Sequence, residues 1–240
     1  MVKTISAFAI TILTIIFCTP IGIVCMVLSV LGLKKPASWI VYKIAQIWAR
    51  IIIRITGCDM DVRGRENIPS KGGVCFVSNH VGIFDIVLAL AYAGRPFGFI
   101  AKKELLYLPF IDIWIYILGG LFIDRVSIRK AKKTIDLGIQ KLQKGGSMLI
   151  FPEGTRSKGH GLLPFRSGAI KLATNSLVPI VPIAIAGSYE VFEKDYRVHG
   201  VPIKMVFCPA INTSELSSED RRHSLPDQVR SIIEAALKQS

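Results

Sequence analysis

Uncharged, mostly apolar residues fill the beginning of the chain. Residues 4–33 include no charged side chain, and Lys34 and Lys35 follow them directly. A continuous helix over this run would be about 45 Å long, whereas the hydrocarbon core of a bilayer is roughly 30 Å thick. Pro20 and Gly22 near its middle predict a break into two short helices, which would form a hairpin in one leaflet. A single tilted span and a cleaved signal peptide are the alternatives.

A mixed pattern of apolar and basic residues follows. Between Trp39 and Ile55, apolar positions recur at helical spacing and are interleaved with basic ones. Such a pattern is typical of an amphipathic helix at a membrane interface, or of a helix packed on a soluble domain. Under the positive-inside rule, the basic residues beyond the apolar run place the rest of the chain in the cytoplasm. These residues are Lys34, Lys35, Lys43, Arg50 and Arg54.

From Val74 onward, short apolar runs alternate with longer stretches of helical periodicity. The predicted strands are Val74–Ser78, Phe97–Ala101, Leu121–Asp124, Ser147–Phe151, Pro179–Ile185 and Lys204–Cys208. The predicted helices are Phe84–Ala93, Pro109–Leu118, Ile128–Lys144, Phe165–Asn175 and Pro226–Lys238. Strands separated by helices need crossover connections, so the predicted fold class is α/β, with a mainly parallel sheet flanked by helices. We therefore predict membrane-associated helices over residues 1–57 and an α/β domain over residues 58–240.

Composition narrows the class of partner. The chain has a formal net charge of +13, 51% hydrophobic residues and a mean hydropathy of +0.47. Basicity alone would suit nucleic acid or an anionic membrane, but basicity with so many apolar residues favours a phospholipid membrane. No recognisable nucleic-acid-binding module occurs, so we expect no nucleic-acid partner. The five cysteines have no C-x-x-C spacing, which argues against a disulfide framework and against a zinc site.

Polar clusters follow three of the predicted strands, at the point where each strand ends. These clusters are Asn79–Asp85, Asp124–Arg125 and Pro152–Ser157. Ligands of open α/β sheets bind outside the carboxyl ends of the strands. Any one cluster could reflect helix capping, because Asn, Asp and Ser are favoured at helix starts. Three of them together predict a functional site at this edge of the sheet.

His80 and Asp85 are the candidate base and its partner. Their five-residue spacing across a strand-to-helix loop lets the carboxylate reach one ring nitrogen and leave the other free. A carboxylate partner increases the basicity of an imidazole, which suits removal of a proton from a hydroxyl. The alternative is a capping aspartate beside an unrelated histidine. The motifs G-x-S-x-G, H-E-x-x-H, G-x-x-x-x-G-K-[ST] and G-x-G-x-x-G are absent, which argues against a serine hydrolase, a zincin, a P-loop and a dinucleotide site.

Basic residues near the same strand ends are candidate ligands for an anion. Arg125 and Arg156 lie in loops after strands, where a guanidinium can hold a phosphate through two hydrogen bonds. Lys102 and Lys103 follow another predicted strand and could join them. The basic residues within 128–144 are more typical of a solvated or lipid-facing helix surface.

Four blocks occur in order along the chain. They are Asn79-His80-x-x-x-x-Asp85, Gly120–Arg125, Phe151–Ser157 and Val178–Ile183. Together they resemble the blocks of the glycerolipid acyltransferase family, specifically the bacterial 1-acyl-glycerol-3-phosphate acyltransferases. The resemblance covers residues 60–210, and an N-terminal two-helix membrane element is also a trait of this family. It implies transfer of an acyl chain from a thioester to the free sn-2 hydroxyl of lysophosphatidic acid, which gives phosphatidic acid.

The resemblance also implies roles for individual residues. His80 would deprotonate the acceptor hydroxyl, and Asp85 would support the imidazolium. Acceptor and phosphate binding are implied for Lys102, Lys103, Arg125, Glu153, Gly154, Thr155 and Arg156, with the choice between the two lysines open. The acyl-donor side is implied for Val178, Pro179 and Pro182. No metal or resident cofactor is implied, because the thioester of acyl carrier protein or coenzyme A is consumed as a substrate.

Three further expectations complete this picture. The enzyme would sit in the cytoplasmic (inner) membrane, with its active site at the cytoplasmic face. Backbone N–H groups of the Glu153–Gly154 loop are candidate donors for the oxyanion that forms during acyl transfer. The alternative functions are an acyltransferase for glycerol-3-phosphate or another lysophospholipid, and a non-catalytic membrane protein that binds anionic lipids.

Overall fold

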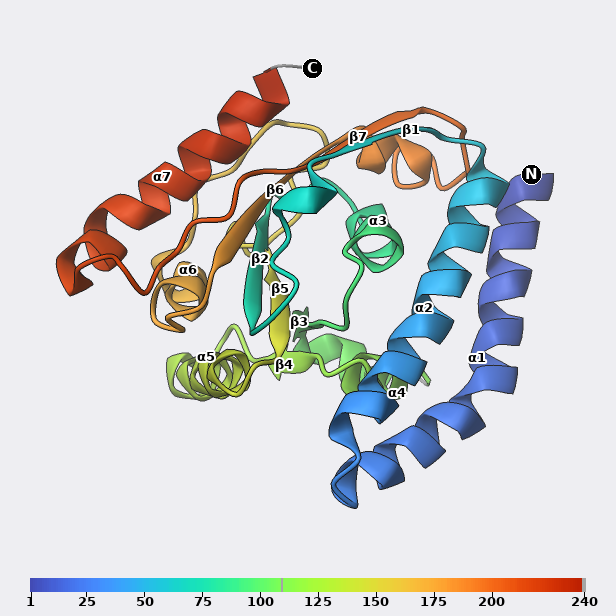
Figure 1. Cartoon of the computed structure of the whole chain (residues 1–240). Coiled ribbons are helices and arrows are strands. Elements are labelled where there is room, and N and C mark those ends of the chain that lie inside the picture. The colour runs from blue at the N-terminus through green and yellow to red at the C-terminus, as the bar shows by residue number, and fades with distance from the viewer. Residues whose placement is uncertain (109, 239–240) are drawn as a thin grey trace.

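The computed structural model describes residues 1–108 and 110–238, and its centre is a seven-stranded sheet in the order β1-β7-β6-β2-β5-β3-β4 (Figure 1). The strands are β1 (Asp59–Arg63), β2 (Val74–Ser78), β3 (Gly98–Lys102), β4 (Leu121–Ile123), β5 (Ser147–Ile150), β6 (Ile180–Ala186) and β7 (Pro202–Phe207). Neighbouring strands run parallel except for β6 and β7, which are antiparallel. The prediction of a mainly parallel sheet is therefore confirmed.

Six of these strands correspond to the six predicted ones, and β1 is the strand that the prediction missed. Its sequence mixes acidic and basic residues with two apolar ones, and its side chains are at most partly buried. β1 lies at the edge of the sheet and pairs only with β7 among the described residues. A strand that buries so little has no clear apolar signature in its sequence.

The helices after the N-terminal pair lie where the pattern predicted them, with shifted ends. They are α3 (Phe84–Tyr92), α4 (Ile111–Ile117), α5 (Ile128–Gln143), α6 (Ser167–Thr174) and α7 (Ser218–Lys238), with short 3-10 turns η1 (Arg65–Asn67), η2 (Lys103–Tyr107) and η3 (Ser188–Val191). The predicted start of the fourth helix at Pro109 lies outside the described residues. α7 begins at Ser218 rather than at Pro226, because the Ser217 hydroxyl accepts a hydrogen bond from the Asp220 N–H (3.0 Å) and caps an earlier turn.

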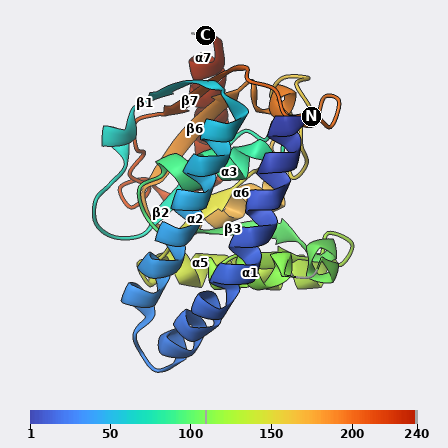
Figure 2. The ribbon, with the colours of Figure 1, turned by 90° about the vertical axis from the view of Figure 1, so that its right-hand side faces the viewer.

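The N-terminal apolar run forms one helix, which corrects the predicted break at Pro20 and Gly22. α1 extends over Val2–Val30 with Pro20 inside it, and the chain turns only at residues 31–33. α2 (Lys34–Thr56) then runs back beside α1 (Figures 1 and 2). A proline removes one helical hydrogen bond and bends a helix without having to end it. Figure 1 shows α1 bent partway along its length.

One face of α1 is fixed to the rest of the protein by polar contacts, and the opposite face is bare and apolar. The contacts are Lys3 Nζ to Thr56 O (2.8 Å), Val198 N to Thr4 Oγ1 (2.9 Å), Trp48 Nε1 to Thr11 Oγ1 (3.3 Å) and Trp114 Nε1 to Thr19 Oγ1 (3.0 Å). The exposed apolar side chains of α1 include Ile5, Ile12, Ile16 and Phe17. By length and composition, α1 is the one helix among the described residues that could cross a membrane.

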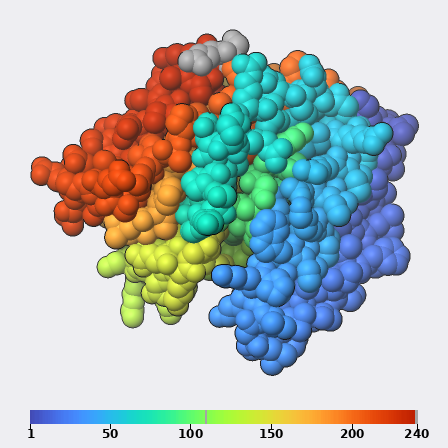
Figure 3. All heavy atoms as spheres, viewed as in Figure 1, coloured from blue at the N-terminus to red at the C-terminus, as the bar shows by residue number. Residues whose placement is uncertain are grey.

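The sheet is buried on both faces, as crossover connections require. Along β2, Phe76 belongs to one hydrophobic cluster, whereas Cys75 and Val77 on either side of it belong to the other. The first cluster also contains Tyr42 and Ala49 of α2, so the N-terminal helices share a core with the sheet. Figure 3 shows the blue hairpin of α1 and α2 and the red helix α7 on opposite sides of the molecule.

Candidate active site

The loops that follow β2 and β5 meet at the carboxyl end of the sheet. These two strands are parallel neighbours, so their ends lie side by side. The Ser157 N–H donates to the His80 carbonyl (2.7 Å), and the Lys158 N–H donates to the Val81 carbonyl (3.1 Å). Two of the predicted polar clusters are thus joined directly through their backbones.

His80 and Asp85 form the predicted pair. His80 Nδ1 lies 2.7 Å from Asp85 Oδ2, and this oxygen also accepts from the N–H groups of Val81 (2.7 Å) and Gly82 (3.0 Å). The Asp85 side chain is completely buried, whereas that of His80 is 18% exposed. Because the carboxylate can only accept, it selects the tautomer with hydrogen on Nδ1. Nε2 is then the ring nitrogen with a free lone pair.

Phe151 covers one face of the His80 ring, a contact that the sequence did not predict. The two ring centroids are 3.9 Å apart and the planes differ by 16°. The negative face of an aromatic ring attracts a cation, so Phe151 is placed to stabilise positive charge that develops on this ring.

Glu153 is directed at backbone groups rather than at open space. Its side chain accepts from the N–H of His80 (Oε1, 2.8 Å) and from the N–H of Leu163 (Oε2, 3.2 Å). The residue is only 2% exposed, and burial raises the pKa of its carboxyl group above the ordinary value, against the opposing effect of these hydrogen bonds. The geometry assigns Glu153 to holding the His80 loop, because each of its carboxylate oxygens already accepts a backbone N–H.

The neighbouring Gly154 and Thr155 also differ from the sequence-based expectation. The Gly154 N–H donates back to the Phe151 carbonyl (3.0 Å), so it does not point at a substrate oxyanion. Gly154 has a positive φ of 70°, and a Cβ there would lie 2.8 Å from Arg166 Cδ, which explains why glycine is required. Thr155 is exposed.

Arg166 is a basic residue of the site that the sequence analysis missed. Its backbone N–H donates to the Pro152 carbonyl (2.8 Å) and its Nε donates to the Glu153 carbonyl (3.1 Å), so it fixes the loop after β5. Arg125 lies close enough to Arg166 for the two positive charges to repel each other. Burial, and next the nearby charge of Arg166, lower the pKa of Arg125 below its ordinary value. Two guanidinium groups under mutual repulsion favour a bound anion.

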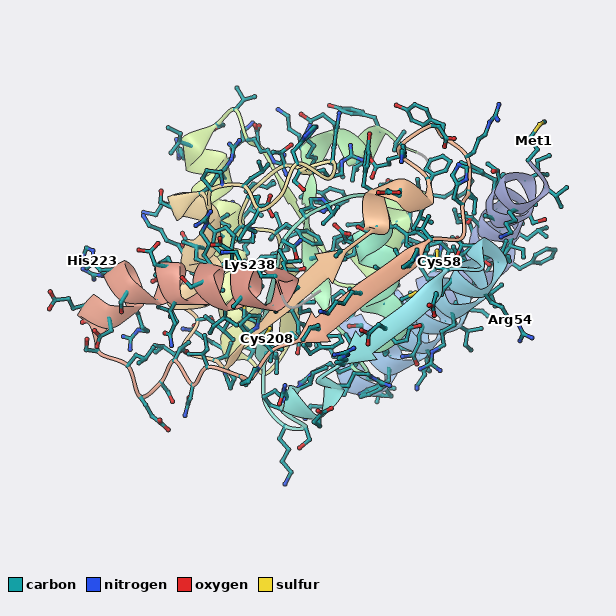
Figure 4. All side chains as sticks on the ribbon, turned by 90° about the horizontal axis from the view of Figure 1, so that it is seen from above. Met1, Arg54, Cys58, Cys208, His223 and Lys238 are labelled. Atoms are coloured by element: carbon teal, nitrogen blue, oxygen red, sulfur yellow. The ribbon has the colours of Figure 1, made fainter. Side chains whose placement is uncertain are left out.

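An open cavity of about 1340 Å³ begins at His80 and extends between α5, α6 and α7. Its walls include Ile100, Ile123 and Ile135, together with Arg125 and Arg166. His223, labelled at one end of α7 in Figure 4, lines the cavity on the side of that helix. The cavity therefore combines an apolar wall with cationic groups next to the histidine.

The two lysines after β3 have different surroundings. Lys103 Nζ donates to Asp124 Oδ2 (3.0 Å), whereas no hydrogen bond or ion pair involves the ammonium group of Lys102 among the described residues. Lys102 lies in β3 two positions after Ile100, so both side chains emerge on one face of the sheet. Ile100 lines the cavity on that face, whereas Lys102, which is exposed, is not among the lining residues.

Arg156 is paired with Glu193, a second residue that the sequence analysis missed. Arg156 Nη1 donates to Glu193 Oε1, and Glu193 Oε2 accepts from the Ile83 N–H. Glu193 therefore links the loop after β5 to the start of α3. Ser188 is a third missed residue, because its hydroxyl donates to Asp85 Oδ1. These partners are more than a hundred residues from Asp85 or Ile83 along the chain, and no local sequence signal marks them.

The three residues expected on the acyl-donor side are not brought to this cavity. Val178 and Pro179 precede β6, which is parallel to β2, so they lie at the opposite end of the sheet from His80. Pro182 is buried within β6, opposite Val77 of β2. Their contacts are those of core strand residues: the carbonyls of Pro179 and Pro182 accept from the N–H groups of Cys75 (3.0 Å) and Cys208 (2.8 Å).

Comparison with known proteins agrees with this architecture. A family model described as Acyltransferase matches residues 59–186. The chain is 31% identical to the 1-acyl-sn-glycerol-3-phosphate acyltransferase of Borreliella burgdorferi over 79% of this chain and 76% of that one. It is 32% identical to the Escherichia coli protein of the same name, over 75% and 74% of the two chains. The crystal structure of the 1-acyl-sn-glycerophosphate (LPA) acyltransferase PlsC from Thermotoga maritima superposes with a TM-score of 0.76 at 25% identity, over 99% of this chain and 97% of that one.

Proposed function

The chain belongs to the acyltransferase family, and from that premise we propose that it transfers an acyl chain from a thioester to the free sn-2 hydroxyl of 1-acyl-glycerol-3-phosphate, giving phosphatidic acid. The observation that carries the proposal is the hydrogen bond between His80 Nδ1 and Asp85 Oδ2, in which His80 lines a partly apolar, cationic cavity. The names of the relatives support lysophosphatidic acid as the acceptor.

The chemistry begins at His80. With hydrogen on Nδ1, the free Nε2 takes the proton of the sn-2 hydroxyl as its oxygen attacks the thioester carbonyl carbon. Asp85 stabilises the imidazolium from the Nδ1 side, and Phe151 stabilises it through its ring face. The tetrahedral intermediate then collapses, the C–S bond breaks, and the imidazolium returns its proton to the departing sulfur. These steps are written without a metal ion or a resident cofactor. That the enzyme needs neither stays a prediction.

Cationic side chains would hold the acceptor's phosphate. Lys102 and Arg125 are our first candidates, because the ammonium group of Lys102 has no partner among the described residues and Arg125 is beside another guanidinium. Arg156 is a third candidate, although Glu193 already occupies one of its nitrogens. The apolar wall of the cavity suits an acyl chain. The thioester carrier, acyl carrier protein or coenzyme A, stays open in this proposal.

The N-terminal hairpin would hold the enzyme in a membrane. The exposed face of α1 carries large apolar side chains along its length, which favours contact with lipid over contact with water. Figure 4 shows Met1 and Arg54 at the same side of the molecule, and Lys3 reaches the carbonyl of Thr56. Both ends of the hairpin can therefore stay on one side of the bilayer. We propose the cytoplasmic side of the inner membrane, because the basic residues Lys3, Arg50 and Arg54 lie towards the two ends of the hairpin.

The direct test is an assay of the purified enzyme with lysophosphatidic acid and glycerol-3-phosphate as rival acceptors, each with both thioester donors. His80→Ala should reduce turnover by about 10²- to 10⁴-fold. His199→Ala is a matched control, because His199 Nε2 also pairs with a carboxylate, Asp195 Oδ2 at 2.9 Å, but is not among the residues that line the cavity.

The outcomes separate the alternatives. Turnover above a tenth of wild type in His80→Ala would exclude His80 as the essential base. Preference for glycerol-3-phosphate would replace the proposed acceptor. Absence of turnover with every pair of substrates, combined with binding of anionic lipid vesicles, would favour the non-catalytic alternative.

A further inference from the structure

The second oxygen of the Asp85 carboxylate has its own partner, the hydroxyl of Ser188. Ser188 is 1% exposed, and among the described residues it is the one group that donates to Asp85 Oδ1. We propose that Ser188 is a positioning residue of the acyl-transfer reaction, which acts by holding the Asp85 carboxylate in the orientation that His80 needs. This inference rests on the proposed function of His80 and Asp85.

The orientation of this carboxylate needs a constraint on both of its oxygens. An aspartate side chain rotates easily about its last torsion, where the energy wells are broad. Oδ2 is held by three donors, namely the His80 ring and the N–H groups of Val81 and Gly82. Without a donor, the buried Oδ1 would lack a hydrogen bond. The carboxylate would then lower its free energy by rotating so that these donors are shared between its two oxygens. The Ser188 hydroxyl gives Oδ1 its own hydrogen bond, so this rotation no longer lowers the free energy.

The backbone, rather than the hydroxyl, places Ser188. Gly187 follows β6 and has a φ of 85°, and a Cβ there would lie 2.4 Å from the Pro202 carbonyl oxygen, so this position requires glycine. The following residues pack on the catalytic loop, where a Cβ on Gly82 would lie 3.1 Å from Tyr189 Cα. Glu193 then accepts from the Ile83 N–H. Since these contacts remain without the hydroxyl, Ser188→Ala should leave the segment in place.

The hydroxyl also affects how the histidine responds to pH. A donor on Oδ1 disperses the negative charge that the Nδ1–H group of His80 meets. Removing it concentrates that charge, which favours the imidazolium. The acidic limb of the pH–rate profile should therefore move to higher pH in Ser188→Ala. A purely structural hydroxyl would change stability and leave this limb where it is.

The experiment compares Ser188→Ala with Ser176→Ala in the purified full-length enzyme. Ser176 is a suitable control because it is also 1% exposed, and its hydroxyl donates to the Ala173 carbonyl (3.0 Å) outside the site. We expect kcat of Ser188→Ala to fall about ten-fold, as for loss of one hydrogen bond to a charged group, with KM for both substrates within about two-fold of wild type. Ser176→Ala should lose thermal stability to a similar degree but keep the kcat and pH profile of the wild type.

A second variant protects the test against a folding defect. Ser188→Cys has a somewhat larger side chain and keeps a donor, although a weaker one, so its kcat should lie between those of the wild type and Ser188→Ala. A folded Ser188→Ala or Ser188→Cys enzyme with wild-type kcat and an unshifted acidic limb would overturn the inference. The proposed function fails separately, when wild type does not acylate lysophosphatidic acid or when His80→Ala stays active.

Discussion

Lys103 Nζ donates to Asp124 Oδ2 over 3.0 Å, which joins the residue after β3 to the residue after β4. β3 and β4 are parallel, and Lys102 lies opposite Ile123. The residues that follow them, Lys103 and Asp124, therefore lie side by side at the carboxyl ends of the two strands. The hydrogen bond raises the pKa of Lys103 and lowers that of Asp124 from their ordinary values. Lys103 is thereby paired with a carboxylate, whereas the ammonium group of Lys102 can bind a phosphate.

The two lysines should consequently differ in their effect on acceptor binding. We expect Lys102→Ala to raise KM for lysophosphatidic acid by about ten- to a hundred-fold, the usual effect of losing a charged hydrogen bond. Lys103→Ala should raise it less, because its ammonium group is already neutralised by Asp124. Steady-state kinetics of the two variants decides the matter. A larger increase in Lys103→Ala would show that the ion pair opens to receive the phosphate.

Arg125→Ala and Arg156→Ala test the arginines of the second and third blocks. Each should raise KM for the acceptor by about ten- to a hundred-fold while KM for the thioester changes little. Arg125 has the stronger physical case, since a bound anion would relieve its repulsion from Arg166, which the nearby Glu104 opposes to a smaller extent. If the thioester KM rises instead, these arginines bind the donor.

Phe151→Leu tests the stack on His80. Leucine keeps the apolar volume but removes the aromatic face, which stabilises a cation by roughly 0.5–1 kcal/mol or more. We expect a several-fold lower kcat and an acidic limb of the pH–rate profile that moves to lower pH, opposite to the shift expected for Ser188→Ala. Phe151→Tyr, which keeps the ring, should retain the wild-type limb. An unshifted limb in Phe151→Leu would limit Phe151 to packing.

Glu153→Gln tests the buried carboxyl group through stability rather than turnover. Burial raises the pKa of Glu153 in the folded protein, so the folded state binds its proton more tightly than the unfolded state does. The contribution of the carboxyl group to stability is then greatest below the unfolded value of about 4.3 and falls as the pH rises above it. Glutamine cannot titrate. The melting temperature of wild type minus that of Glu153→Gln should therefore decrease from pH 4 to pH 6, and a rise over this range would contradict the assignment.

The position of α1 can be tested by thiol labelling in cells. In a variant without the five native cysteines, we would place a cysteine at Val2, which is exposed at the start of α1. If both ends of the hairpin face the cytoplasm, an impermeant thiol reagent should label this cysteine only after the cells are opened. A cysteine placed at Tyr196, which is exposed in the α/β domain, serves as the cytoplasmic control. Labelling of position 2 in intact cells would mean that α1 crosses the bilayer.

The sequence alone was sufficient for the elements whose signal is local. Strands such as Val74–Ser78 and helices such as Ile128–Gln143 follow from apolar periodicity, which depends only on neighbouring residues. The His80–Asp85 pair was also predictable, because both residues belong to one loop and its spacing limits how far apart they can be. The family resemblance rested on blocks that are likewise local in the chain.

Tertiary structure decided everything that depends on contacts between distant segments. Pro20 does not end α1, because that helix is supported along its length by contacts with Trp48, Trp114 and Val198. The fourth block, Val178–Ile183, does not line the cavity. Because β6 runs parallel to β2, the block begins at the amino ends of these strands, whereas His80 follows the carboxyl end of β2. Ser188 and Glu193 reach the catalytic loop over more than a hundred residues of chain. A hydrogen bond is formed by atoms within about 3 Å, and only the folded chain sets that distance for residues so far apart in sequence.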